Sequence, residues 1–300
     1  FAYSMVFGLL SGNNNIIRLP SKNFHQVKIL CDILFKISKK KKYKKNFKKF
    51  SLIKYENSDS ISSELSRIVD ARVIWGGDNT IKKFKKYETK PRCIDLTFAD
   101  RYSISIIDAK KLEKLNNQDF KNLVQKFYND TYTMDQFGCS SPNSIFWLSK
   151  SVIAKKKFWL YLNKVVNEKY NLDLSGANKK ISNLMDFSIK KNEDFKLSLN
   201  NLNLIKFKNK KINLENINNL NYGTFAEINL SNLNYLKSFT SEKLQTITYF
   251  GISFDRLKKF IIKNKIKGID RIVPIGRAFD LTPEWDGVDI ISILSRTLGK

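Results

Sequence analysis

Apolar residues along the chain follow two kinds of pattern. Short runs rich in β-branched and aromatic residues predict strands, and they cover residues 15–19, 51–55, 71–75, 93–97, 103–107, 245–250 and 271–275. Longer stretches carry apolar residues at helical spacing, and they cover residues 24–35, 62–69, 80–87, 117–128, 151–171 and 254–264. Strands and helices alternate, which is typical of βαβ units. The sequence therefore predicts an α/β fold with a mainly parallel sheet.

Two stretches add detail to this outline. Pro20 and Ser21 have the residue types of a helix start, so we expect a helix to begin there with Ser21 as its cap. Cys31 falls on the apolar stripe of that helix and Cys93 falls in a predicted strand, so both are expected to be buried. Residues 175–245 are rich in Asn, Lys and Leu but poorly patterned, and they predict only mixed α/β structure.

The chain of 300 residues has a formal net charge of +26, which is typical of proteins that bind nucleic acid or anionic surfaces. Of its 54 basic residues, 9 are Arg and 45 are Lys, spread along the whole sequence. Such a diffuse excess is typical of an AT-rich coding sequence, whereas nucleic-acid readers favour Arg. We therefore expect no nucleic-acid partner. A cationic module that binds nucleic acid or a membrane surface through the lysine-rich run 39–49 is the alternative from another functional class.

Cysteine and histidine are scarce. The three cysteines, Cys31, Cys93 and Cys139, form neither a disulfide framework nor a metal-ligand spacing, and His25 is the single histidine. We expect free thiols in a reducing cytoplasm and no metal site. No apolar run approaches the roughly 18–20 residues of a membrane span. The chain begins without an initiator methionine and in mid-pattern, so we expect that an N-terminal part is missing.

Two loops have residues suited to a phosphate site. Gly76 and Gly77 end the strand 71–75 before a helix, where the backbone can approach a pyrophosphate. Arg18, Ser21 and Lys22 form a basic, hydroxyl-lined corner for an adenosine ribose or its 2′-phosphate. The GxGxxG fingerprint is absent. Plain turn chemistry explains the glycines as well, and a solvated strand end explains the corner.

Cys139 is the candidate nucleophile. It follows Gly138, which breaks any apolar stripe, and precedes Ser140, Ser141 and Pro142, which have the pattern of a helix start. A thiol beside a helix N-terminus has a lowered pKa, and its thiolate is the reactive form. A loop cysteine without a catalytic role is the alternative from the residues alone.

These segments, together with 270–280 and 285–287, resemble the aldehyde dehydrogenase superfamily, and most closely its acyl-CoA reductase branch, known from bacterial bioluminescence. The resemblance is strong at 11–22, 73–78, 133–142, 270–280 and 285–287. It implies an aldehyde dehydrogenase-like fold with an open parallel-sheet cofactor domain and an α/β catalytic domain. We expect the remaining part of the NAD(P)-binding domain at 1–100, the cysteine-bearing domain at 101–275 and a C-terminal segment at 276–300.

The resemblance also implies roles. Arg18 takes the place of a lysine beside the adenosine ribose, and Ser21 stands where many NAD-dependent members have a glutamate. Since Ser21 and Lys22 would accept a 2′-phosphate, we predict that NADPH is the cofactor. Gly76 and Gly77 match the turn under the pyrophosphate, and Cys139 matches the catalytic cysteine. The asparagine that stabilises the oxyanion in this superfamily would lie upstream of residue 1.

One departure narrows the reaction. The segment that supplies a general-base glutamate in aldehyde-oxidising relatives is 95–99 here, and it contains no glutamate. Without a base to activate water, an acyl-enzyme would not be hydrolysed and would persist until a hydride reduces it. We predict reduction of a fatty acyl thioester to an aldehyde through acyl-Cys139, with an aldehyde or semialdehyde dehydrogenase as the alternative. Expected partners are acyl-CoA or an acyl-carrier, an acyl-protein synthetase and further copies of the chain in a homo-oligomer.

Overall fold

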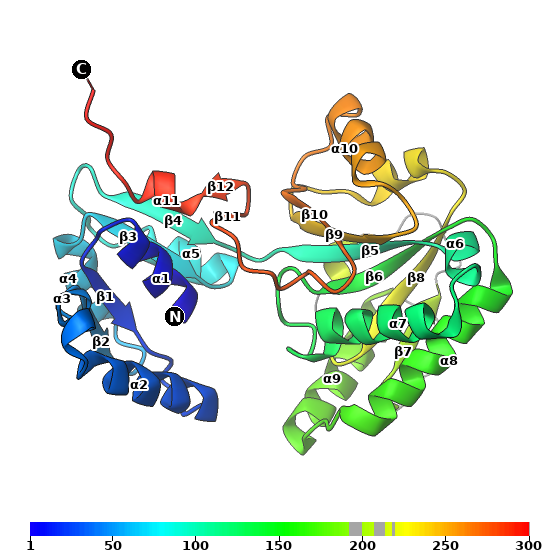
Figure 1. Ribbon diagram of the computed structural model, residues 1–300, viewed down its shortest axis with the longest axis horizontal. Coiled ribbons are helices and arrows are strands. Elements are labelled where there is room, and N and C mark those ends of the chain that lie inside the picture. The colour runs from blue at the N-terminus through cyan, green and yellow to red at the C-terminus, as the bar shows by residue number, and fades with distance from the viewer. Residues whose placement is uncertain (192–199, 207–213, 218–219, 300) are drawn as a thin grey trace. The chain divides into compact units, whose positions relative to one another are not determined.

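The computed structural model describes residues 1–191, 200–206, 214–217 and 220–299. Contacts divide the chain into two compact units. The N-terminal unit contains residues 1–100 and 281–300, and the central unit contains residues 101–280 (Figure 1). The assignment of cofactor binding to residues 1–100, of catalysis to 101–275 and of a separate segment to 276–300 stays a prediction.

The N-terminal unit contains two pairs of parallel strands and one short antiparallel pair. The parallel pairs are β1 (Asn15–Arg18) with β2 (Phe50–Ile53) and β3 (Ala71–Trp75) with β4 (Ile94–Phe98), and β11 (Glu284–Trp285) pairs with β12 (Val288–Asp289). Its helices are α1 (Ala2–Leu10), α2 (His25–Ser38), η1 (Lys41–Tyr43), α3 (Lys44–Phe47), α4 (Asp59–Ile68), α5 (Asp78–Phe84) and α11 (Ile290–Ile293). Each parallel pair is joined through at least one helix, so the predicted βαβ arrangement is present in this unit.

Aromatic packing and one ion pair hold the N-terminal unit together. Phe7, Phe98 and Trp285 belong to one buried apolar cluster, so the C-terminal segment completes the core around α1 and β4. Arg72 on β3 binds both carboxylate oxygens of Asp95 on β4, at 2.7 and 2.6 Å. This two-pronged contact is the geometry for which a guanidinium and a carboxylate are best matched, and it locks the β3–β4 pair.

The expected start of the second helix is wrong. Helix α2 begins at His25, its N-cap is Phe24, and no side chain caps it, so Ser21 lies in the loop before it. Ser21, Lys22 and Asn23 are polar and exposed, so a helix over them would have no apolar face to pack, and packing of such a face supplies most helical stability in proteins. Cys31 and Cys93 are half-buried rather than buried, because α2 has no fully buried residue and Cys93 precedes β4.

Within the described residues, the central unit is built on a parallel sheet of six strands. Their order is β10 (Arg271–Pro274), β9 (Leu244–Phe250), β5 (Tyr102–Asp108), β6 (Pro142–Leu148), β8 (Thr224–Leu230) and β7 (Asn203–Lys206). The other elements are α6 (Ala109–Glu113), α7 (Asn117–Tyr132), α8 (Val152–Lys169), α9 (Leu174–Lys191), η2 (Leu214–Asn216), η3 (Leu233–Phe239) and α10 (Phe254–Lys263). The predicted α/β class and parallel sheet are confirmed.

Buried apolar clusters cover both faces of this sheet. Ile107, Ile145 and Trp147 face residues of α7 and α8 in one cluster. Ile106 and Phe146 belong to the other, which contains residues of α9, η3 and α10. Figure 1 shows α7 and α8 on one side of the sheet and α10 on the other. Strands buried on both faces are expected to be continuously apolar, which explains why polar residues within them mark special positions.

Parts of the weakly patterned segment 175–245 lie outside the described residues. The described parts contain helix, 3₁₀ and strand, so the expectation of mixed structure is met there. Among the described residues, no helix is both long enough and apolar enough to cross a membrane.

Candidate active site

Cys139 lies in the turn of residues 133–141, which connects α7 to β6. The prediction of a helix start after Cys139 is wrong, because Pro142 begins the seven-residue strand β6. Its last four residues, Ile-Phe-Trp-Leu, are apolar or aromatic, and proline is tolerated as the first residue of a strand. The thiol is therefore followed by a strand, and among the described residues no helix begins directly after it. The residue is half-buried at the amino-terminal edge of the sheet.

The main chain at Cys139 is fixed to two strands by one serine. The Ser103 hydroxyl on β5 donates to the carbonyl oxygen of Cys139 at 2.6 Å and accepts from the N–H of Thr246 on β9 at 3.1 Å. Ser103 is fully buried, so neither contact is exchanged with water. A buried hydroxyl bonded on both sides is a strong positional restraint.

Gln136 ties the same turn to β8. Its Oε1 accepts from the N–H groups of Gly223 and Thr224 at 2.7 and 3.1 Å, and its Nε2 donates to the Thr224 carbonyl at 3.2 Å. Asp135 and Gln136 both have positive φ, 51° and 63°. Backbone in this region is strained for residues other than glycine and persists where surrounding contacts enforce it. The Gln136 amide supplies such contacts.

Asp130, near the end of α7, holds a second loop beside this turn. Its carboxylate accepts from the N–H groups of Gly276 at 2.6 Å and Ala278 at 3.1 Å. Burial raises the pKa of Asp130 to about 6, against the effect of those two N–H donors. Its main-chain carbonyl accepts from the Ser141 hydroxyl at 2.8 Å. The 275–280 loop and the Cys139 turn therefore share one anchor.

The candidate cofactor residues lie in the N-terminal unit and form two separate groups. Lys22 and Lys54 line an open cleft of about 470 Å³ together with Phe24 and Lys28. Lys54 donates to the side chain of Asn23 at 2.6 Å. Lys54 was missed from the sequence, because it reaches the cleft from the residue after β2 and is distant in the sequence from the loop after β1.

Arg18 and Ser21 have different settings. The Arg18 guanidinium lies 4.5 Å from the centre of the Tyr55 ring and donates to the Tyr55 carbonyl at 3.3 Å. Ser21 is exposed and does not line the cleft. The structure thus brings Lys22 and Lys54 together at the cleft and turns Arg18 toward Tyr55.

Two carboxylate side chains, those of Asp78 and Asp100, lie at the Gly76–Gly77 turn. The N–H of Gly76 bonds to the Phe98 carbonyl at 3.2 Å. The N–H of Asp78 bonds to the Asp100 carboxylate at 3.0 Å, and a Cβ added to Gly77 would lie 3.0 Å from the same carboxylate. Side-chain oxygens of Asp100 therefore occupy the start of α5, where an anion was expected to bind.

Comparison with known proteins identifies the family. The sequence matches the family of acyl-CoA reductases (LuxC) over residues 1–297. The chain belongs to the acyl-CoA reductase family. This is a family of oxidoreductases, and the resemblance inferred from the sequence is confirmed. No curated protein sequence matches the chain.

Several solved structures similar to this acyl-CoA reductase family member are dehydrogenases. An NAD-dependent aldehyde dehydrogenase from Sinorhizobium meliloti superposes with a TM-score of 0.63 at 11% identity, over 94% of this chain and 57% of its own. For a 1-pyrroline-5-carboxylate dehydrogenase variant from Thermus thermophilus, the TM-score is 0.62 at 10% identity, over 97% and 61%. For a methylmalonate-semialdehyde dehydrogenase of S. meliloti complexed with NAD, it is 0.60 at 12% identity, over 97% and 64%.

These similarities confirm the aldehyde dehydrogenase-like fold. The chain spans less than two thirds of the length of each of the three structures, 57%, 61% and 64%. Within this family member, the residues fit a nicotinamide dinucleotide only in part. The lysines of the cleft suit a phosphorylated ribose, whereas the carboxylates of Asp78 and Asp100 do not suit a pyrophosphate at the Gly76–Gly77 turn.

Proposed function

We propose that the protein reduces a fatty acyl thioester, acyl-CoA or acyl-protein, to an aldehyde through an acyl-Cys139 intermediate, with NADPH as the reductant. The observation that carries the proposal is the setting of Cys139. A half-buried thiol stands on a turn fixed by Ser103 and Gln136, in a member of the acyl-CoA reductase family. A fixed nucleophile is what acyl transfer requires, because orientation removes much of the entropic barrier.

The proposed reaction has two stages at the Cys139 sulfur: transfer of the acyl group to it, and release of the reduced group as an aldehyde. The Cys139 thiolate forms a C–S bond to the acyl carbonyl carbon, and the thiol of CoA or the carrier leaves with a proton. A bound nicotinamide supplies the hydride that reduces this carbonyl. The C–S bond to Cys139 then breaks, the aldehyde leaves, and the thiol regains its proton. No water is consumed, in contrast to oxidation of an aldehyde to an acid.

Segment 95–99 supports reduction over aldehyde oxidation. Aldehyde oxidation requires a general base that activates water, and this segment contains no glutamate. The one carboxylate within the segment, that of Asp95, is bound by two nitrogens of the Arg72 guanidinium. An acid locked in such a pair is a poor proton acceptor, because its charge and lone pairs are already engaged.

The cleft between α2 and the β1–β2 pair supports NADPH. A 2′-phosphate adds about two negative charges to the ribose, and the lysines of the cleft, Lys22, Lys28 and Lys54, face no carboxylate among its lining residues. Arg18 and Ser21 are proposed to flank the ribose. Because Asp100 occupies the α5 start, we derive no step that depends on Gly76 and Gly77.

Partners and compartment are also proposals. The expected partners are acyl-CoA or an acyl-carrier, an acyl-protein synthetase that supplies the acyl group, and further copies of this chain. The three cysteines are free thiols, which supports action in a reducing compartment such as the cytoplasm.

Intact-mass analysis tests the proposal. The protein is incubated with a panel of acyl-CoAs, and we expect one acyl adduct, mapped to Cys139, that disappears with aldehyde release when NADPH is added. Cys139→Ser should abolish the adduct, while Cys31→Ser and Cys93→Ser should keep it. An adduct that persists in Cys139→Ser would refute the assignment. Faster acid formation from aldehyde and NADP⁺ than the reverse reaction would favour the dehydrogenase alternative.

A further inference from the structure

The loop of residues 275–280 is held by opposite charges on its two sides. Asp130 on α7 accepts from the N–H groups of Gly276 and Ala278. Arg271 on β10 donates to the carbonyl oxygens of Ala278 at 2.8 Å and Asp280 at 3.0 Å. The carboxylate binds the loop's donors and the guanidinium binds its acceptors. We call this pair of contacts the loop clasp.

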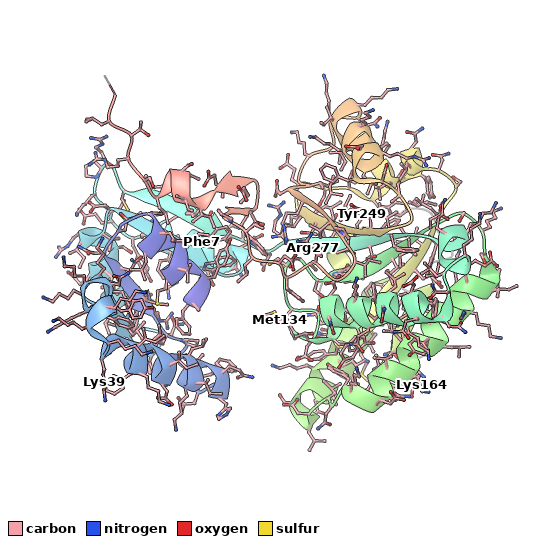
Figure 2. All side chains as sticks on the ribbon, in the orientation of Figure 1. Phe7, Lys39, Met134, Lys164, Tyr249 and Arg277 are labelled. Carbon is pink, nitrogen blue, oxygen red and sulfur yellow. The ribbon has the colours of Figure 1, made fainter. Side chains whose placement is uncertain are left out.

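The clasped loop touches the Cys139 turn at one point. A Cβ built on Gly138 would lie 2.6 Å from a ring carbon of Phe279 and 3.8 Å from the sulfur of Met134, so the Phe279 ring lies directly against the Gly138 backbone. Figure 2 labels Met134 on the turn and Arg277 on the loop, which locates the two segments in the central unit. Asp130 also contacts the turn itself, through the hydrogen bond from Ser141.

We propose that the loop clasp of Asp130 and Arg271 positions the Cys139 turn by holding Phe279 against Gly138. Both are positioning residues, since they reach the thiol through the loop. The effect on catalysis rests on the proposed role of Cys139. The clasp also gives a physical role to the segment 270–280, which the reaction at Cys139 does not use directly.

The two hydrogen bonds that Asp130 accepts from the 275–280 loop depend on its negative charge. Each carboxylate oxygen accepts one N–H, Oδ2 from Gly276 and Oδ1 from Ala278. Protonation of either oxygen would place an O–H donor opposite an N–H donor. One of the two hydrogen bonds would then be lost. Because burial raises the pKa of Asp130 to about 6, this change falls in an accessible pH range.

Four other charged side chains lie near Asp130 or on the loop that it holds: Arg271, Asp280, Lys126 and Arg277. Arg271 lowers the pKa of Asp130 and Asp280 raises it. The side chain of Lys126, which lies on the same helix as Asp130, packs against Gly276 of the loop. Asp280 is paired with Arg277 at 2.6 Å. Asp130, whose pKa burial raises to about 6, is the group expected to titrate in this window.

The test measures thiol exchange at Cys139 with 4,4′-dithiodipyridine in a Cys31→Ser/Cys93→Ser background. The readout is the ratio of the rate in Asp130→Asn to the rate with Asp130 intact, across pH, since this ratio cancels the titration of the thiol. We expect a ratio of roughly three or more above about pH 7, where the clasp is lost only in the variant. Below about pH 5 the ratio should approach one, because Asp130 is then protonated.

Two further variants make the result decisive. Phe279→Ala leaves Asp130 in place but removes the contact, so it should give the same ratio curve, and it decides the matter if Asp130→Asn fails to fold. Asp119→Asn, an exposed carboxylate on the same helix, should give a ratio near one throughout. A ratio for Asp130→Asn that stays near one, or that is raised equally at every pH, would overturn the clasp. The exchange needs neither thioester nor NADPH, so a missing acyl adduct would refute the proposed function separately.

Discussion

Ser103 and Cys139 are joined by a 2.6 Å hydrogen bond from a fully buried hydroxyl to a main-chain carbonyl. The bond connects the first part of β5 to the turn before β6, while the same hydroxyl accepts from Thr246 on β9. The backbone that carries the thiol is thereby fixed by strands on the sheet rather than by its own loop. Sites supported by regular elements hold their geometry better than sites on free loops.

Removal of this hydroxyl should harm both stability and acyl transfer. Ser103→Ala leaves the Cys139 carbonyl and the Thr246 N–H buried without their shared partner, at a cost of about 1–3 kcal/mol of unfolding free energy. The acyl-transfer rate should fall by roughly tenfold, because the thiol is less well placed. Urea denaturation and single-turnover acylation measure the two effects.

Ser105→Ala is the matched control for that experiment. It lies two residues further along β5, is fully buried, and its hydroxyl has no hydrogen-bond partner among the described residues. Its removal should leave stability unchanged or raise it slightly. If both variants lose the same stability and activity, the contact to Cys139 has no special role.

Gly138 is predicted to tolerate no side chain. In Gly138→Ala the new Cβ would meet the Phe279 ring at 2.6 Å, and such overpacking typically costs about 1–3 kcal/mol. Acyl transfer should fall as the turn shifts. The double variant Gly138→Ala/Phe279→Gly removes the steric conflict, so it should recover part of the stability lost in the single variant relative to Phe279→Gly alone. A double-mutant cycle without coupling would show that the contact carries no strain.

Strands and helices with strong periodicity were predictable from the sequence. The run Ala71–Trp75 was predicted to the residue, because β-branched residues bounded by turn residues leave little choice. β6 was missed because Ser140, Ser141 and Pro142 have the composition of a helix start. Pairing with β5 and β8 outweighed that local preference, as tertiary context commonly does.

The groups that support the site were less visible. Asp130 left a signal that went unused, a charge three residues after Phe127 on the buried face of α7. Ser103 is one of two buried serines in β5, and the sequence does not distinguish it from Ser105. Gln136 and Lys54 left no signal, because their partners come from segments that are distant in the sequence. Such contacts depend on chain topology, which local pattern does not encode.

Stability should depend on pH through Asp130. Its pKa rises from 3.8 in the unfolded chain to about 6 in the folded protein, through burial. Between these values the folded state binds more protons, so the unfolding free energy falls as pH rises from about 4 to about 6 and is level above that. The loss is on the order of 3 kcal/mol.

Asp130→Asn isolates that contribution. Other carboxylates titrate equally in both proteins, so the difference between their unfolding free energies should change by that amount between about pH 4 and pH 7. Like protonated Asp130, the Asn side chain offers one acceptor to the N–H groups of Gly276 and Ala278, and it does not titrate, so the variant adds no slope of its own. Urea denaturation at a series of pH values measures the difference. A difference that is constant over this range would contradict the raised pKa.

Cofactor preference should depend on the lysines of the cleft. Lys22 and Lys54 line it together, and a 2′-phosphate is the feature that separates NADPH from NADH. Lys22→Glu and Lys54→Gln should each raise the KM for NADPH by on the order of tenfold, since loss of one charge-assisted contact has about this effect on affinity. kcat and the KM for NADH should stay within about twofold, because the reacting end of the cofactor is untouched. Lys39→Gln, an exposed lysine of the same unit outside the cleft, controls for the general positive charge. An equal change for NADH and NADPH would mean that these lysines bind a part common to both cofactors, and no change for either would move the ribose site elsewhere.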